Sequence, residues 1–343
     1  RTADNEATLF ERKVALSFVQ GAGAIEWLWN TNSYMTEGNE VPIGALRADS
    51  TEKPEATVMR DFAKWAKTAA PDLKSPQRPA VAIVTSQAAQ FSVIGDLQIE
   101  AQRRAVRALS YYCRTSGYII AENQVAKLGT PQLVILPSPQ ALQESTWQAL
   151  LSYVASGGNL LITGPVNRDE HWRRVDRASA LRIPAAIEPL MYRNAELAWD
   201  GRAVSLNFNL AAQSWLEAVR FADGETVKQI PHGKGRIFWA AYPVELSEEI
   251  DVSADLYAYV LAQAGIHPAF ELESKVSPGV LIHATDLQNA MLYVMESESS
   301  EPADITVRDR AARKEITVRL LSQRAALVVI RKSDGAITAR YGF

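Results

Sequence analysis

Residues 80–86 read AVAIVTS, an unbroken apolar run rich in β-branched side chains that ends in two hydroxyl residues. Runs of this kind are typical of strands buried on both faces of a parallel sheet. Strand-like and helix-like segments then alternate as LQIEAQRRAVRALSYYCRTSG (97–117), YIIAENQ (118–124), PQLVILPSP (131–139), TWQALLSYVASGG (146–158) and NLLITGPV (159–166). This alternation predicts an α/β domain with a doubly wound parallel sheet, whose two faces are covered by helices.

Downstream of this region the pattern changes twice. Residues 185–245 hold mixed strand-like segments, and a closing helix is expected over 253–266. Short apolar runs then recur roughly every ten residues, separated by polar turns. These runs are VLIHATD (280–286), AMLYVME (290–296), DITVRDR (304–310), EITVRLL (315–321), AALVVIR (325–331) and ITARY (337–341). We therefore expect a doubly wound domain over 77–268 and a small antiparallel β-sandwich over 269–343.

The first 76 residues hold too few elements for a domain of their own. Residues 4–23 predict a helix, AIEWLW (24–29) a strand, residues 30–50 a polar loop and residues 53–73 a second helix. These three regular elements cannot enclose a core alone. We interpret residues 1–76 as the closing segment of a larger α/β domain.

Two tryptophans and two asparagines gather where the strand at 24–29 ends. If this strand belongs to a parallel barrel, its C-terminal end is where ligand chemistry lies. We predict that Trp29 and Trp27 offer indole faces to a sugar ring, while Asn30 and Asn32 bond sugar hydroxyls. The alternative is that both indoles pack in a core and that the amides form turns.

Three glutamates lie close to this cluster in the sequence. Glu37 and Glu40 flank Gly38 and Asn39 in the following loop. Their carboxylates either grip sugar hydroxyls or act as acid and base, or they are simply solvated. Glu26 lies inside an apolar strand and so needs a partner, which is either an ion pair within a barrel or a ligand.

The ordered motifs of the whole chain resemble one family. WLWNTNSY (27–34), NEVPIGALRADSTEKPE (39–55) and a helix with Phe62 and Trp65 resemble the eighth strand and helix of clan-A glycoside hydrolases. The match is to the β-galactosidase type, glycoside hydrolase family 42. In that family a flavodoxin-like trimerisation domain follows the barrel, and GKGRIFWAAYPVEL (233–246) is similar to its last strand. The segments PGVLIHATD, LYVMESES and VRLLSQRAALVVIRK, between 278 and 332, resemble the small C-terminal β domain.

The resemblance implies a fold, a reaction and an assembly. Residues 1–76 become the C-terminal edge of a TIM (β/α)8 barrel, residues 77–268 a flavodoxin-like domain and residues 269–343 the β domain. The family is retaining and uses two glutamates, at the ends of strands four and seven. Strand four is absent, and strand seven should lie just before the helix that begins near Asp4, so its glutamate would precede Arg1. Glu6 and Glu11 lie in that helix and do not match the motif. No catalytic residue is therefore assigned.

What transfers from the family is substrate binding. Trp29 with Asn30 and Asn32 would form the strand-eight sugar platform, and Glu40 would reach the sugar from its loop. The expected partners are a carbohydrate substrate, a barrel segment upstream of this chain and, by resemblance, two further copies in a homotrimer. The sugar, its linkage and the compartment stay open.

Composition excludes several other classes. The 343 residues carry a formal net charge of −3 without a polybasic run, which argues against nucleic acid and anionic membranes as partners. No apolar run approaches the ~18 residues of a membrane span. A single cysteine excludes an intrachain disulfide and a cysteine-built metal site, and the four histidines show no HxH or HExxH spacing. We expect no metal.

The doubly wound domain is expected to be chemically silent. Its first βα turn, TSQAAQFSVIGD (85–96), lacks a glycine-rich phosphate loop, so we expect no flavin or nucleotide cofactor. Class I glutamine amidotransferases share this general architecture, but Cys113 lies within a helix rather than on a strand-to-helix elbow, and we expect a packed thiol. RDEHWRRVDR (168–177) predicts a solvated loop or short helix, or a subunit contact.

Two functions remain. The first is the C-terminal portion of a retaining, β-galactosidase-like glycoside hydrolase. The alternative is a non-catalytic oligomerisation or carbohydrate-binding module. The two functions predict different burial of four aromatic side chains, Phe10, Phe18, Trp27 and Trp65. The chain's own domains would cover them in the module but not in the hydrolase portion.

Overall fold

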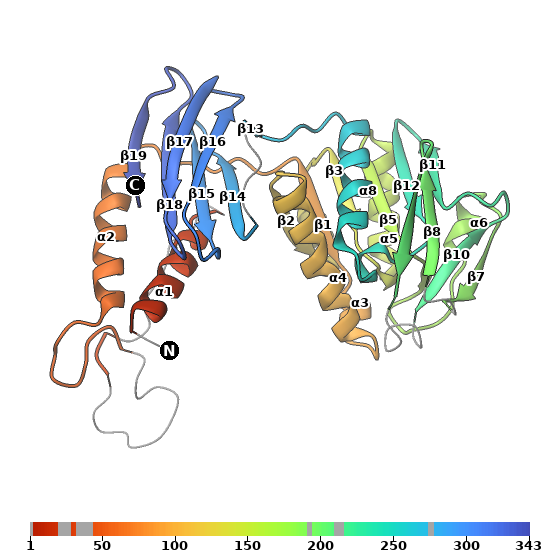
Figure 1. Cartoon of the computed structure of the whole chain (residues 1–343). Helices are drawn as coiled ribbons and strands as arrows, with labels where there is room; N and C mark the ends of the chain where they lie inside the picture. The colour runs from red at the N-terminus through yellow and green to blue at the C-terminus, as the bar shows by residue number, and fades with distance from the viewer. Residues whose placement is uncertain (1–2, 20–28, 32–43, 191–193, 209–215, 274–277) are drawn as a thin grey trace. The chain divides into compact units, whose positions relative to one another are not determined.

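The computed structural model describes residues 3–19, 29–31, 44–190, 194–208, 216–273 and 278–343. The chain forms two compact units. One comprises Arg1–Arg78 together with Pro268–Phe343, and the other comprises Pro79–His267. The sequence-based division into three domains stays a prediction. What the structure adds is that the first and last segments of the chain share one unit (Figure 1).

The unit Pro79–His267 is built on a six-stranded sheet in the order β11-β12-β5-β3-β1-β2. Five strands run parallel, and β11 pairs antiparallel with β12. The strands are β1 (Val81–Thr85), β2 (Gly117–Ala121), β3 (Leu133–Leu136), β5 (Asn159–Thr163), β11 (Val227–His232) and β12 (Gly235–Ala240). The predicted parallel sheet is confirmed.

Side chains of this sheet alternate between two cores. Val81 and Ile83 of β1 pack in one core, whereas Ala82 and Val84 pack in the other, so β1 is buried on both faces. This is why AVAIVTS has no polar alternation. The helices among the described residues of this unit are α3 (Gln87–Gln90), α4 (Gly95–Arg107), η1 (Ala108–Tyr112, a π-helix), η2 (Glu122–Lys127), α5 (Glu144–Ala155), α6 (Arg177–Ala180), η3 (Val244–Leu246) and α8 (Ile250–Gln263).

The described residues of this unit also form three short strand pairs apart from the main sheet. They are β4 (Gln140–Ala141) with β6 (Val166–Arg168), β7 (Ala185–Pro189) with β10 (Glu217–Phe221), and β8 (Asn194–Trp199) with β9 (Arg202–Asn207). Sequence analysis expected mixed strands over 185–245 without singling out β10 or β11; the sequence of β11, VKQIPH, has few apolar side chains.

The other unit contains two antiparallel sheets, as expected for its C-terminal part. One holds β13 (Phe270–Leu272), β16 (Ala303–Asp309) and β17 (Lys314–Leu320). The second holds β14 (Val280–Asp286), β15 (Ala290–Ser297), β18 (Ala325–Arg331) and β19 (Ile337–Tyr341). One face of each sheet contributes to a shared core, which contains Met291, Tyr293 and Met295 of β15.

The opposite face of the four-stranded sheet is covered by two helices, α1 (Ala3–Ser17) and α2 (Pro54–Ala69). Leu292 and Val294 of β15 pack here with Phe62 and Trp65 of α2. The aromatic ring of Tyr341, in β19, stacks on Phe62 at a centroid distance of 4.2 Å. In Figure 1 both helices lie beside this sheet. Hydrophobic burial thus fixes the first segment of the chain to the last.

Candidate functional site

The predicted sugar platform begins at Trp29, whose indole is 61% exposed. Its backbone is nevertheless fixed. The Leu46 N–H donates to the Trp29 carbonyl at 2.8 Å, and the Thr31 N–H donates to the Leu46 carbonyl at 2.9 Å. These bonds form a short parallel bridge between Asn30 and Leu46. An exposed indole on an anchored backbone suits a stacking surface, because little backbone entropy is then lost on binding.

Gly44 lies against this segment. A Cβ atom added at Gly44 would lie 2.2 Å from the backbone carbon of Asn30 and 2.2 Å from the nitrogen of Thr31. The next residues are held by a tight turn, in which the Asp49 carboxylate accepts from the Thr51 N–H at 3.0 Å. The loop that the sequence shows as polar is therefore ordered where it meets Trp29.

Gly44→Ala is expected to displace the Trp29 segment and to cost about 1–3 kcal/mol of unfolding free energy, because the added methyl meets backbone atoms that cannot rotate away. Thermal unfolding and acrylamide quenching of tryptophan fluorescence would measure both effects. Ala48→Ser, at an exposed position of the same loop, is the matched control. Wild-type stability and quenching in the glycine variant would contradict this account.

The structure places only part of the predicted site. Trp29 and Asn30 are adjacent and exposed, and their role in binding a sugar stays a prediction. Trp27, Asn32 and Glu40, like Glu26 and Glu37, lie outside the described residues. Among the aromatic side chains that distinguish the two functions, Trp65 is buried against the C-terminal sheet and Phe10 and Phe18 are partly buried there. Trp27 is not described.

A second polar centre lies at the carboxyl ends of the parallel strands, and sequence analysis missed it. Glu245 of η3 is buried, and its carboxylate accepts from three hydroxyl groups, each at 2.6 Å. The donors are Ser138 after β3, Thr163 at the end of β5 and Tyr257 of α8. Burial raises the pKa of Glu245, and the three hydroxyl groups partly offset that rise. The only sequence signal was a carboxylate within the apolar run YPVEL.

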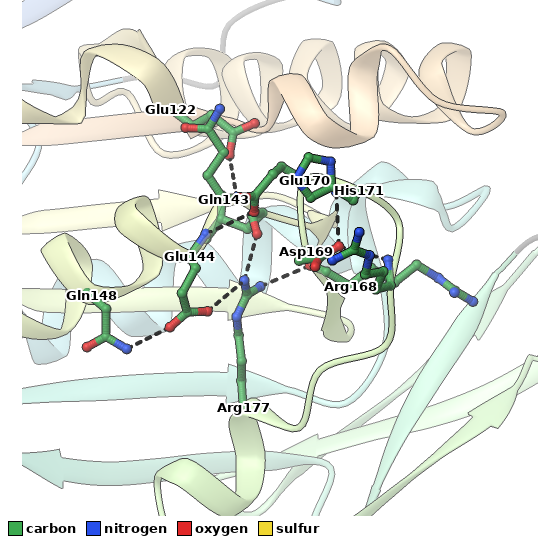
Figure 2. A network of polar contacts seen from close by, with 11 residues as sticks. Glu122, Gln143, Glu144, Gln148, Arg168, Asp169, Glu170, His171 and Arg177 are labelled. Carbon is green, nitrogen blue, oxygen red and sulfur yellow. Dashed lines mark hydrogen bonds and ion pairs between the residues drawn. The ribbon is translucent and has the colours of Figure 1, made fainter.

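A third polar centre is formed by Glu122, which directly follows β2 (Figure 2). It is buried and accepts from the N–H of Ala88 at 2.5 Å and from that of Gln143, before α5, at 2.9 Å. The Gln87 N–H also donates to it. These backbone donors form the kind of cradle that holds phosphate at helix N-termini in other α/β proteins. Here a side chain of the protein already fills it.

The arginine-rich stretch at 168–177 is more ordered than a solvated loop. Arg177, labelled in Figure 2, is 3% exposed. Its guanidinium donates to the Leu142 carbonyl at 2.6 Å. It also pairs with Glu144 at 3.4 Å and lies over the Trp147 ring. The prediction of a solvated segment is therefore wrong for Arg177, because its charge is matched by acceptors from distant parts of the chain. The remaining charged residues of the stretch are mostly exposed.

The lone thiol and the histidines show no arrangement for catalysis in the described parts of the chain. Cys113 is buried, and burial raises the pKa of its thiol to about 12, which disfavours the reactive thiolate. No group of three or more histidine, cysteine or acidic side chains that could hold a metal lies among the residues described. Within the same residues, no helix is long and apolar enough to cross a membrane.

Comparison with known proteins gives a likeness of structure alone. No protein-family model matches the chain, and no curated protein matches it by sequence. Gan42B, a GH42 β-galactosidase from G. stearothermophilus, is similar over 89% of this chain and 48% of its own length, with a TM-score of 0.64 and 16% identity. The β-galactosidase from Bacillus circulans sp. alkalophilus gives 93% and 52%, a TM-score of 0.67 and 12% identity.

A cold-adapted β-galactosidase from Rahnella sp. R3 is similar over 94% of this chain and 51% of its own, with a TM-score of 0.62 and 14% identity. The chain therefore spans about half the length of these structures. At such identities the comparisons establish a shared fold over nearly the whole chain. They do not extend the catalytic activity of those proteins to this one.

Proposed function

We propose that this chain is the C-terminal portion of a retaining glycoside hydrolase of the β-galactosidase type. The observation that carries the proposal is the shared fold with GH42 β-galactosidases over about nine-tenths of this chain but only about half of theirs. In this proposal residues 1–76 are the closing edge of a TIM barrel, Pro79–His267 corresponds to the flavodoxin-like domain, and 269–343 to the C-terminal β domain. Both catalytic glutamates belong to a preceding barrel segment.

The site contributed by this chain would bind the sugar. Trp29 would stack on the apolar face of the ring, and Asn30, with Asn32 and Glu40, would bond its hydroxyls. The chain by itself is expected to leave nitrophenyl β-galactoside intact, since it would lack the two carboxylates that a retaining mechanism requires. Turnover by a sample shown by mass spectrometry to hold only this chain would overturn the proposal.

Trp29→Ala is expected to weaken binding of galactose by about tenfold, which corresponds to ~1.4 kcal/mol for the lost stacking surface. A galactose titration followed by NMR would measure the affinity, and Trp29→Phe should retain part of it. Equal affinities in wild type and in Trp29→Ala would remove this residue from the site.

One observation favours the non-catalytic module as a second candidate. Trp65 is buried within this chain, and Phe18 meets it edge-on at a centroid distance of 5.0 Å. The packing of Trp65 and Phe18 within the chain is what a module would need. Sedimentation would measure the oligomeric state and so test the proposed homotrimer. A stable oligomer without affinity for galactose in the titration above would favour an assembly module. Affinity for galactose that depends on Trp29 would favour the hydrolase portion.

A further inference from the structure

Helix α4 continues directly into η1, and together they form one helical segment of the unit Pro79–His267. The inner face of this segment is buried, since Ala101 and Ala105 lie in the same core as Val81 and Ile83 of β1. The opposite face of α4 is exposed to solvent. The order of the side chains along that exposed face indicates what binds there.

The exposed face of α4 is acidic at one end and basic at the other. Asp96 and Glu100 lie in the first half of the helix. Arg103 and Arg107 lie in the second half. At 3.6 residues per turn these four side chains fall within a sector of about 60°, so they share one face. Asp96, Arg103 and Arg107 form no ion pair among the described residues. Glu100 pairs with Arg104 of the same helix at 2.7 Å, and its side chain stays 43% exposed.

Exposed apolar side chains lie at both ends of this charged face. Phe91 and Val93, in the turn before α4, are 83% and 66% exposed. Tyr112, at the end of η1, is 39% exposed. The backbone of the turn is fixed, because the Ile94 N–H donates to the Ser92 hydroxyl at 3.2 Å and the Ile94 side chain is buried. Little backbone entropy is therefore lost when Phe91 and Val93 pack on a partner.

A second copy of the same helix, running antiparallel, matches this order of side chains. If a twofold axis passes between Ala101 and Gln102, each residue faces the residue at the same distance beyond the axis in the other copy. The facing pairs are Asp96 with Arg107 of the partner subunit, Glu100 with Arg103 of the partner subunit, and Phe91 with Tyr112 of the partner subunit. Each pair occurs twice, because a twofold contact uses the same patch on both subunits. A parallel copy would instead bring like charges together, which is unfavourable.

We propose that the exposed face of α4 is a self-association surface, on which a second copy of this chain packs antiparallel about a twofold axis near Gln102. This contact goes beyond the proposed homotrimer, since a closed ring of three joins two different patches of each subunit. The two contacts are compatible, and a particle that uses both holds six chains.

Sedimentation of the full chain tests the twofold contact. Wild type should form a particle with an even number of chains. Asp96→Arg places arginines opposite one another at both ends of the contact, so it should halve that number and weaken association by about tenfold or more. Arg107→Asp should have the same effect. The double variant, Asp96→Arg with Arg107→Asp, restores opposite charges and should restore the wild-type particle.

Glu196→Arg is the matched control, because it reverses an exposed charge on β8 of the same unit and should leave the assembly unchanged. All variants should keep the wild-type Tm, since the altered side chains are exposed. A wild-type particle of one or three chains would overturn the twofold contact, as would single variants that assemble like wild type or a double variant no better than the single ones. A particle of three chains would leave the proposed homotrimer standing, so the two proposals fail separately.

Discussion

Glu245→Ala is expected to destabilise the protein by about 3–5 kcal/mol, one of the two largest effects of a single substitution anticipated here. The carboxylate joins hydroxyl groups from β5, α8 and the segment after β3. Its removal leaves those three buried hydroxyls without their acceptor and creates a cavity between the elements. For a folding unit of this size the expected fall in Tm is roughly 10 °C.

Denaturant unfolding at neutral pH would measure the loss. Glu248→Ala removes an exposed carboxylate three positions along and is expected to change the stability by less than ~0.5 kcal/mol. Glu245→Gln preserves the side-chain shape, so its loss of stability should lie between those of Glu245→Ala and Glu248→Ala. If the alanine variant unfolded within about 1 kcal/mol of wild type, the network would not have the stabilising role assigned to it.

The second large effect is a loss of stability with rising pH that depends on Glu296. This residue of β15 is 3% exposed, and its Oε1 has no hydrogen-bond partner among the described residues. Burial raises its pKa from 4.5 to about 8, with Glu298 adding to the rise and Arg12 opposing it. The folded protein therefore holds a proton that the unfolded chain releases above about pH 4.5.

The sign of the effect follows from this proton. Between about pH 4.5 and pH 8 the folded state binds more protons, so the free energy of unfolding falls as the pH rises and levels off above about pH 8. At ~1.4 kcal/mol for each pH unit the ceiling is about 5 kcal/mol, and we expect roughly 2–4 kcal/mol because the site relaxes around the charge.

Glu296→Gln should remove most of this dependence, since the amide is neutral throughout. Unfolding curves collected from pH 5 to pH 9 would compare it with wild type and with Glu301→Gln, an exposed control that should follow wild type. A glutamine variant whose stability fell as steeply as that of wild type would show that another group carries the pH dependence.

Local patterns in the sequence were sufficient to predict most of the helices and strands. The β-branched run at 80–86 predicted a parallel strand, because a strand buried on both faces is apolar throughout. The short runs between 280 and 341 predicted antiparallel strands, because they recur at short spacing between polar turns. For Trp29 the sequence left two alternatives open, an indole packed in a core or one facing a ligand, and only the tertiary structure shows it 61% exposed. Strand β11 was not singled out, because VKQIPH has few apolar side chains.

The polar centres required the tertiary structure. Glu245 meets Ser138 across 107 positions and Thr163 across 82, and Glu11 pairs with Arg324 across 313. No periodicity links such residues, since their proximity arises only when the sheets form and the helices pack. The sequence by itself determined which segments become strands and helices, through short-range alternation of apolar and polar side chains. The packing of α1 and α2 on the last sheet, and the carboxylates buried between elements, were decided by the tertiary structure, because long-range hydrophobic burial and hydrogen bonding select partners that chain proximity does not.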